Sequence, residues 1–184
     1  PFLISAQDRT CHYDEVVAEM RKSDPNVDQR LMDIRNNAKK WAREAATQKR
    51  GQRATIFIPT VVHVMHNGEP VGTAPNISDD WIMSQIAVLN EDYQATNADL
   101  SDVPSYFQPV IGDMDVQFVM AVLDPNGNAT NGIDRVDMGG SNWNDNQKPG
   151  TIWNPEDYLN IWVADHGGNP LGYATTPGGN PKTD

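Results

Sequence analysis

The chain has 184 residues and a formal net charge of −11, and 38% of its residues are hydrophobic while 21% are charged. This composition excludes a disordered chain, and no apolar run approaches the roughly 18 to 20 residues that span a bilayer. The acidic balance argues against nucleic acid as a partner because phosphate would be repelled, and the single cysteine, Cys11, excludes an internal disulfide framework.

Two helices are predicted in the first part of the chain. A short one covers residues 13–22, and a long amphipathic one covers residues 26–48 because its apolar residues recur at steps of four and three along one face. These are Val27, Leu31, Ile34, Ala38, Trp41 and Ala45. Pro25 marks the start of the long helix, since the residue before a proline avoids the helical conformation. The basic stretch 48–53 lacks periodicity and predicts an exposed linker at a domain boundary.

The charge distribution also divides the chain at Arg53. Up to this residue there are 11 Lys and Arg against 8 Asp and Glu, a balance of +3, whereas the rest has 3 against 17, a balance of −14. We expect two units of opposite charge that attract each other.

After the linker the sequence changes to the pattern of a sheet. Residues 56–66 form an apolar run rich in β-branched side chains, which predicts a central strand covered on both faces. Ser78 is predicted to cap a helix over residues 79–95, with Asp79 and Asp80 at the positive end of the helix dipole. Further strands are predicted at about 114–123, 132–137, 158–164 and 171–175. This order indicates an α/β (α+β) domain with a mixed sheet of five strands.

The predicted sheet is wider than its cover. Five strands spaced about 4.8 Å apart exceed the width of one helix, which is about 10 Å. Nothing after Gly167 predicts a second helix. We therefore expect the natural protein to continue beyond Asp184.

The histidines do not form a recognisable metal motif. His63 and His66 are three residues apart on the predicted central strand, so their side chains point to opposite faces and cannot chelate together. The helical His-Glu-x-x-His motif of zinc peptidases is absent from the chain. We interpret both histidines as structural.

Residues 124–128 place oxygen donors at alternate positions, which is compatible with calcium. The stretch lacks the glycine and the final acidic residue of an EF-hand loop. We predict a hairpin turn here, with calcium as the alternative.

Cys11 lies in the polar stretch formed by residues 7–15. Such surroundings expose a thiol, whereas a structural cysteine is usually buried among apolar side chains. We interpret Cys11 as a functional residue.

Three groups of segments together resemble the pappalysin family of metallopeptidases over residues 55–184. The first group is Ile58-Pro59-Thr60-Val61-Val62-His63-Val64 with residues 77–79 and Gln85-Ile86-Ala87-Val88-Leu89-Asn90-Glu91-Asp92-Tyr93. The second is Phe118-Val119-Met120-Ala121 with residues 124–127 and Gly132-Ile133-Asp134-Arg135. The third is Tyr158-Leu159-Asn160-Ile161-Trp162-Val163 with residues 171–174 and 177–178. Arg9-Thr10-Cys11 extends the likeness into the leader.

The resemblance implies a secreted, metzincin-type zinc endopeptidase that acts on protein or peptide substrates. Residues 1–53 would be a mostly helical inhibitory pro-segment. Residues 54–184 would be the zincin-like upper subdomain, with a twisted mixed five-stranded sheet and a backing helix. Its partner would be the enzyme's own C-terminal catalytic subdomain, which carries the zinc motif, so the resemblance assigns no catalytic residue to this chain.

The resemblance also implies roles for individual residues. Cys11 would bind the catalytic zinc as a thiolate and keep the precursor latent, with Arg9 orienting the segment. This chain has His12 where the family has glycine, which would alter the geometry or compete as a ligand. Activation would cut after Arg50 or Arg53.

Residues Leu171, Gly172, Tyr173, Ala174 and Thr175 would form an edge strand that binds substrate by β-augmentation, or else an ordinary edge strand. The alternative for the whole chain is a non-catalytic binding or inhibitory module that keeps only the sheet subdomain.

Overall fold

The structure, a computed structural model, describes residues 13–46, 54–167 and 172–174. The chain forms two compact units, one made of residues 1–45 and 166–184 and the other of residues 46–165. Within the described ranges, no helix is both long enough and apolar enough to cross a membrane.

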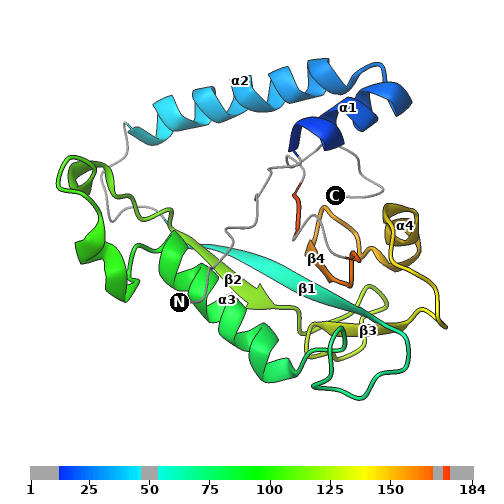
Figure 1. Cartoon of the computed structure of the whole chain (residues 1–184). Coiled ribbons are helices and arrows are strands. Elements are labelled where there is room, and N and C mark those ends of the chain that lie inside the picture. Colours follow the sequence, from blue (N-terminus) through cyan, green and yellow to red (C-terminus); the bar gives the residue numbers. More distant parts are fainter. Residues whose placement is uncertain (1–12, 47–53, 168–171, 175–184) are drawn as a thin grey trace, which may run out of the picture. The chain divides into compact units, whose positions relative to one another are not determined.

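The first unit contains the predicted helical pair. Helix α1 spans Tyr13–Ser23 and helix α2 spans Val27–Ala46 (Figure 1). Val17 of α1 packs against Val27 and Leu31 of α2, and all three side chains are buried. The two predicted helices are therefore confirmed, and residues 47 and 48 of the predicted second helix lie outside the described residues.

Charged side chains close the turn between α1 and α2. Asp24 accepts a hydrogen bond of 2.8 Å from the backbone of Asn26 and pairs with the guanidinium of Arg30. Arg21 of α1 reaches Asp28 of α2, with 2.7 Å between Nη2 and Oδ1. These contacts fix the angle at which α2 leaves the turn.

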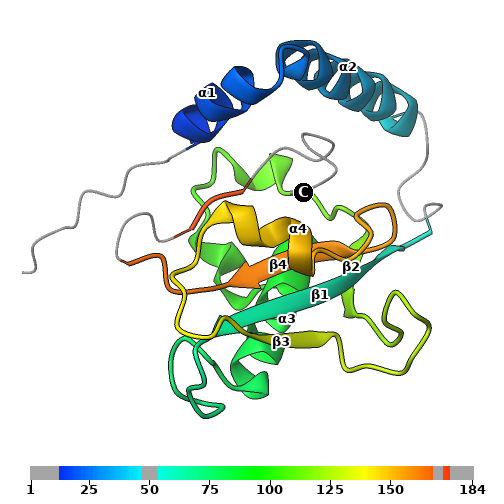
Figure 2. The ribbon, with the colours of Figure 1, turned by 90° about the vertical axis from the view of Figure 1, so that its right-hand side faces the viewer.

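The second unit is built around one long strand. Strand β1 spans Ile56–His66, as predicted, and pairs in parallel with β2 (Val116–Met120), β3 (Ile133–Asp137) and β4 (Leu159–Val163). β2 runs beside the first half of β1, β3 beside the second half, and β4 beside the middle (Figure 2). Every described strand of the sheet thus hydrogen-bonds to β1.

β2 and β3 follow each other along the same edge of β1. The carbonyl of Thr60 accepts from the amide of Ala121 at 2.9 Å, and the amide of Val62 donates to the carbonyl of Gly132 at 2.9 Å. Residues two apart on a strand direct their backbone groups to the same edge. Gly132 has a φ of +77°, and a Cβ there would lie 2.8 Å from the Ala121 nitrogen. Only glycine fits where the chain re-enters this edge.

Helix α3 (Asp79–Tyr93) covers one face of the sheet (Figure 1). Ile82 packs against Val62 and Val64 in the main apolar cluster, and burial of one such side chain contributes about 1.5–3 kcal/mol. The side chain of Asn90 binds both backbone groups of Phe118 on β2, at 2.7 and 3.0 Å. This pair of bonds fixes the helix against the strand.

The start of α3 differs in one detail from the expectation. Ser78 occupies the N-cap position, but its side chain makes no capping hydrogen bond. Arg135 of β3 instead reaches the carboxylate of Asp79 and the side chain of Asn76 just ahead of the helix. The guanidinium of Arg135 therefore binds the first turn of α3 to strand β3.

The second face of the sheet is covered without a long helix. The short 3-10 turns η1 (Ala98–Asp102) and η2 (Gln108–Val110) lie between α3 and β2. After β3 the chain reaches this second face through η3 (Asp145–Gln147) and α4 (Lys148–Thr151). Figure 2 shows α4 and α3 on opposite sides of β1. Within the described residues, Trp153 of this irregular segment and Trp162 of β4 contact His63 on this face, and the expectation of a second long helix beyond Asp184 stays a prediction.

The α/β class and the backing helix are confirmed, while two details of the predicted mixed five-stranded sheet differ. The four described strands are all parallel, because the Asp124 turn closes only a short antiparallel bridge between Leu123 and Ala129 before the chain resumes its direction. The fifth strand is not formed at residues 172–174, and its ends, Leu171 and Thr175, lie outside the described residues.

Candidate functional site

Most residues with a predicted role lie outside the part of the chain that the structure describes. These are Arg9, Cys11, His12, Arg50, Arg53, Leu171 and Thr175. Of the predicted substrate strand, residues 172–174 are described and have no regular secondary structure. The ring of Tyr173 stands edge-on to that of His166, with 5.7 Å between their centroids.

His63 has the most constrained polar side chain of the described sheet. Its ring is fully buried in the middle of β1. Nδ1 lies 2.9 Å from Oδ2 of Asp134 on β3, and Nε2 lies 2.8 Å from Oδ1 of Asn160 on β4. One side chain therefore links three strands.

The partners of His63 are both acceptors. Oδ1 of Asn160 also accepts from the backbone amide of Trp153 at 2.9 Å, while Nδ2 donates to the carbonyls of Trp153 and Tyr158. These bonds leave the carboxamide only one orientation. Both ring nitrogens of His63 therefore face oxygen atoms of side chains on the two neighbouring strands.

Aromatic rings enclose this pair. Trp162 stacks on His63 with centroids 5.1 Å apart and 23° between the planes, and Trp153 meets it edge-on at 6.1 Å. The ammonium of Lys148 lies 5.2 Å from the centre of the Trp162 ring and 3.2 Å from the carboxylate of Asp145. Trp162 thus contacts both the His63 ring and the Lys148 ammonium, and a cation favours the face of an indole.

This cluster is a structural centre and not a catalytic one. Both nitrogens of His63 are saturated and the ring has no solvent access, so it can neither ligate a metal nor exchange a proton with a substrate. The structural interpretation of His63 is confirmed. Sequence reasoning missed Asp134 and Asn160. Asn160 is the one polar residue of the otherwise apolar strand β4, whereas β3 also contains Arg135 and Asp137 and gives no such signal for Asp134.

His66 makes a different contact. Its Nδ1 accepts a hydrogen bond of 3.0 Å from the backbone amide of Gly68 in the turn after β1. It shares no partner with His63. Across the described ranges, no group of three or more His, Cys, Asp and Glu residues could hold a metal ion.

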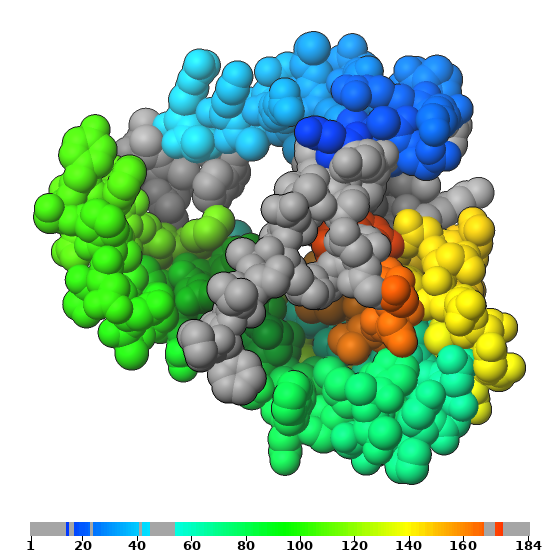
Figure 3. Space-filling model, in the orientation of Figure 1, coloured from blue at the N-terminus to red at the C-terminus, as the bar shows by residue number. Residues whose placement is uncertain are grey.

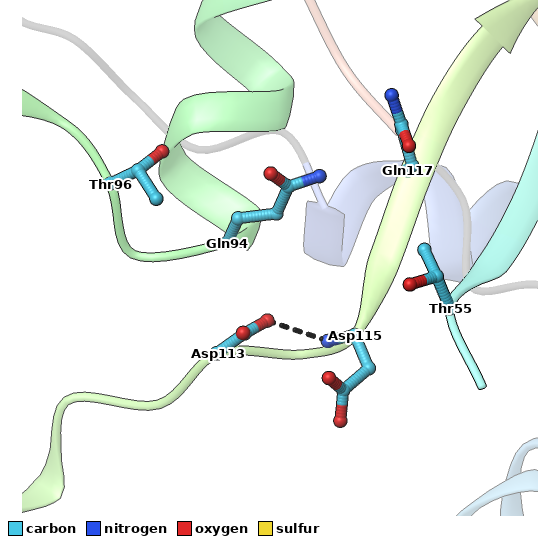
Figure 4. A pocket seen from close by; sticks show the side chains of 6 residues that line it. All are labelled: Thr55, Gln94, Thr96, Asp113, Asp115 and Gln117. Atoms are coloured by element: carbon cyan, nitrogen blue, oxygen red, sulfur yellow. Dashed lines mark hydrogen bonds between the residues drawn. The ribbon is translucent and has the colours of Figure 1, made fainter. Parts of the chain in front are cut away.

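A polar pocket of about 270 Å³ lies where α3 ends and β1 and β2 begin (Figure 4). It is lined by Thr55, Gln94, Thr96, Asp113, Asp115 and Gln117. Asp113 accepts a bond of 2.8 Å from the amide of Asp115. The lining offers carboxylates, carboxamides and hydroxyls but no nucleophile with an adjacent base, so it suits binding of a polar group and not covalent catalysis.

The turn at residues 124–128 is formed as predicted. The carboxylate of Asp124 accepts from the side chain of Asn128 at 3.0 Å and from the backbone amides of Asn128 and Asn126 at 2.8 Å each. The Asn128 side chain, followed by these amides, holds the pKa of Asp124 below its ordinary value. The oxygens are thus directed at N–H groups of the turn, as expected for an Asx-type turn.

Comparison with known proteins adds a relationship that the local geometry does not reveal. Scans against protein-family models and curated proteins give no match. Among solved structures, a mutant of promirolysin from Tannerella forsythia matches at 36% identity and a TM-score of 0.67, over 90% of this chain and 52% of that one. Mature mirolysin from the same organism, in complex with a cleaved peptide, matches at 42% identity and a TM-score of 0.60. That match covers 67% of this chain and 47% of mirolysin.

A second mirolysin structure, in complex with a compound, gives the same identity and the same coverage with a TM-score of 0.59. The chain spans about half the length of each of these structures. The similarity of fold is therefore accompanied by substantial sequence identity, which the shared fold alone would not produce.

Proposed function

This chain matches the N-terminal part of a pappalysin-family metallopeptidase precursor of the mirolysin type, and on this premise we propose that it is part of a secreted zinc endopeptidase zymogen. The observation that carries the proposal is the likeness to promirolysin at 36% identity over 90% of the chain. The peptide in the mirolysin structure supports protein or peptide substrates for the complete enzyme.

Residues 1–53 would be its inhibitory pro-segment. The matched share of this chain falls from 90% for the precursor to 67% for the mature enzyme, a difference of about 42 of the 184 residues. That number is close to the length of the helical leader. The balance of +3 in the leader and −14 in the rest favours their association.

The zinc of such an enzyme does not fit the residues that the structure describes. None of their His, Cys, Asp and Glu side chains form a group of three suited to a metal, and His63 is saturated. The ligands would belong to the C-terminal subdomain of the precursor, which this sheet would support. No catalytic step is therefore assigned to the described side chains.

Cys11 would supply latency in the precursor. A catalytic zinc keeps one position open, and a thiolate binds zinc strongly enough to fill it. His12, next in the chain, would modify the approach of the thiol or compete with it. Residues 171–175 would contribute the strand that pairs with extended substrate.

Activity of the full-length precursor tests the proposal. After removal of the leader, we expect hydrolysis of a denatured protein substrate, loss of that activity with a zinc chelator, and recovery on adding zinc. A matured protein that binds peptides without cleaving them would overturn it. That result would favour the second candidate, a non-catalytic module, which is compatible with the lack of a metal cluster among the described residues.

A further inference from the structure

The sequence contains three Asn–Gly pairs, at residues 67–68, 126–127 and 131–132. In such a pair the glycine nitrogen can attack the asparagine carboxamide, because no side chain on the glycine obstructs it. We propose that the fold makes the first pair a self-modifying site, at which Asn67 converts to aspartate or isoaspartate with His66 as the base.

The nucleophile at this site already contacts a base. The amide of Gly68 donates to Nδ1 of His66 at 3.0 Å, so Nδ1 is the unprotonated ring nitrogen. This distance is within the range required for a general base to take the proton it abstracts. Gly68 is exposed, has a φ of +90° and has nothing within 4 Å of its Cβ position.

The side-chain carboxamide of Asn67, which the Gly68 nitrogen would attack, is held by the turn at residues 140–141. Oδ1 of Asn67 accepts from the amide of Gly140 at 2.8 Å, and Nδ2 faces the carbonyl of Ser141 at 3.4 Å. A donor on Oδ1 stabilises the negative charge that develops there during attack. The site therefore combines a nucleophile, a base and an oxyanion donor.

A second turn keeps these parts together. The amide of Met138 donates to the carbonyl of His66 at 2.7 Å, so the chain after β3 is bound to the end of β1. In Figure 3 the blue-green loop after β1 and the yellow segment near residue 140 lie against each other on the surface. Solvent reaches Asn67, which is exposed.

The reaction follows from these positions. The Gly68 nitrogen bonds to Cγ of Asn67 while its proton passes to Nδ1 of His66. The Cγ–Nδ2 bond then breaks, and ammonia leaves with the proton that His66 returns. Water opens the resulting succinimide at either carbonyl. The net change is hydrolysis of one carboxamide to a carboxylate and ammonia, with no redox step.

The other two pairs lack the base. The amide of Gly127 donates to the backbone carbonyl of Asp124 at 2.9 Å and also bonds its carboxylate, whose pKa is lowered, and the amide of Gly132 donates to the hydroxyl of Thr130 at 3.1 Å. The carbonyl and the hydroxyl remove no proton at neutral pH, and a carboxylate with a lowered pKa is a much weaker base than a neutral imidazole. Gly132 is also buried between strands. Both pairs serve as internal controls within the same chain.

Modification would change the contact between the two turns. A carboxylate at position 67 has no hydrogen to offer the Ser141 carbonyl, and it adds a negative charge beside Glu69, whose carboxylate accepts from the Asn67 amide at 2.6 Å. An isoaspartate would in addition lengthen the backbone. The junction between β1 and the chain after β3 would loosen with the age of the molecule.

Peptide mapping of the full chain tests the proposal. The folded chain is incubated at neutral pH and digested, and mass spectrometry follows deamidation at each of the three asparagines. We expect residue 67 to convert at least about tenfold faster than residues 126 and 131, a modest share of the roughly 100- to 10,000-fold that general acid–base catalysis contributes. In concentrated guanidinium chloride the three rates should converge, because only the dipeptide remains.

The substitution His66→Phe keeps a ring but removes the base, and it should slow conversion at residue 67 alone. The comparison between sites in the unmodified chain needs no variant and holds even if this substitution impairs folding. Equal rates at the three sites in the folded chain would overturn the proposal. So would an unchanged rate at residue 67 in a folded His66→Phe chain.

Discussion

Oδ2 of Asp134 lies 2.9 Å from Nδ1 of His63, and the two residues are register partners on β3 and β1. The histidine is fully buried, and its other nitrogen lies 2.8 Å from Oδ1 of Asn160, so Asp134 is one of its two side-chain hydrogen-bond partners. Removing one member of such a pair leaves the other without compensation.

We therefore expect Asp134→Ala to lower the free energy of unfolding by about 1–3 kcal/mol, the cost of an unsatisfied buried polar group. Asp134→Asn is the matched control, because its carboxamide oxygen still accepts from Nδ1 and should retain part of the stability. Urea unfolding followed by tryptophan fluorescence measures both variants. Equal losses in the two variants would contradict the pairing.

The close approach at Gly132 gives a second prediction. Gly132→Ala places a Cβ 2.8 Å from the Ala121 nitrogen, in addition to the cost of about 1–2 kcal/mol for a left-handed backbone. Gly127→Ala is the control, since Gly127 has a similar φ of +81° but nothing within 4 Å of its Cβ position. Denaturant unfolding should show a clearly larger loss at residue 132. Similar losses would mean that the strand junction tolerates a side chain.

The turn between α1 and α2 should respond to acid. The Asn26 amide, followed by the Arg30 guanidinium, holds the pKa of Asp24 below its ordinary value. A lowered pKa means that this contribution to stability is complete above the ordinary value and is lost as the pH falls through the lowered one. NMR titration of the Asp24 carboxyl should show the lowered midpoint, and Arg30→Gln should raise it. A midpoint unaffected by Arg30→Gln would dismiss the ion pair.

Cys11 is predicted to keep the full-length precursor latent. In the precursor with Cys11→Ala, peptidase activity should appear earlier and the precursor should unfold at a lower temperature, because a ligand of the metal is lost. Time courses of substrate cleavage and thermal unfolding measure the two effects. An unchanged lag with unchanged activity would remove the role of Cys11, and Cys11→Ser separates loss of the thiolate from loss of volume.

Activation is predicted to cut the basic linker at residues 49–53. The first residue of β1, Ile56, is bound to the Asp115 carbonyl at 2.8 Å, so the cut has to fall before the strand begins. N-terminal sequencing of the mature enzyme should find a start between Gly51 and Thr55. A start beyond Ile58 would remove residues that pair with β2 and would refute the boundary.

Local patterns predicted the elements well, and long-range contacts explain what they missed. The apolar, β-branched run at residues 56–66 predicts a buried strand, and apolar residues at steps of three and four predict an amphipathic helix. Both elements, β1 and α2, formed where expected. The partners of His63 stand 71 and 97 residues further along the chain, so no local pattern connects them. The Asp124 turn was recognised from its own residues, yet the direction of the strand after it depends on β1.

The cover of the second face was unpredictable for a related reason. Trp153 lies in an irregular stretch with no helical or strand periodicity, and the role of both Trp153 and Trp162 is defined only by the histidine that they contact. Sequence periodicity reports which side of an element is apolar, but it cannot report which irregular segment will fold over it.

The dependence of every described strand on β1 also governs when the sheet can form during synthesis. Val61 pairs with Asn160, which follows it by 99 residues. At about 5–20 residues per second, a ribosome needs roughly 5–20 s to extend the nascent chain that far. For that interval β1 waits without its last neighbour, while α1 and α2, whose buried side chains Val17, Val27 and Leu31 pack against each other locally, have already been synthesised. The emerging chain is therefore most vulnerable to aggregation just after its leader has folded.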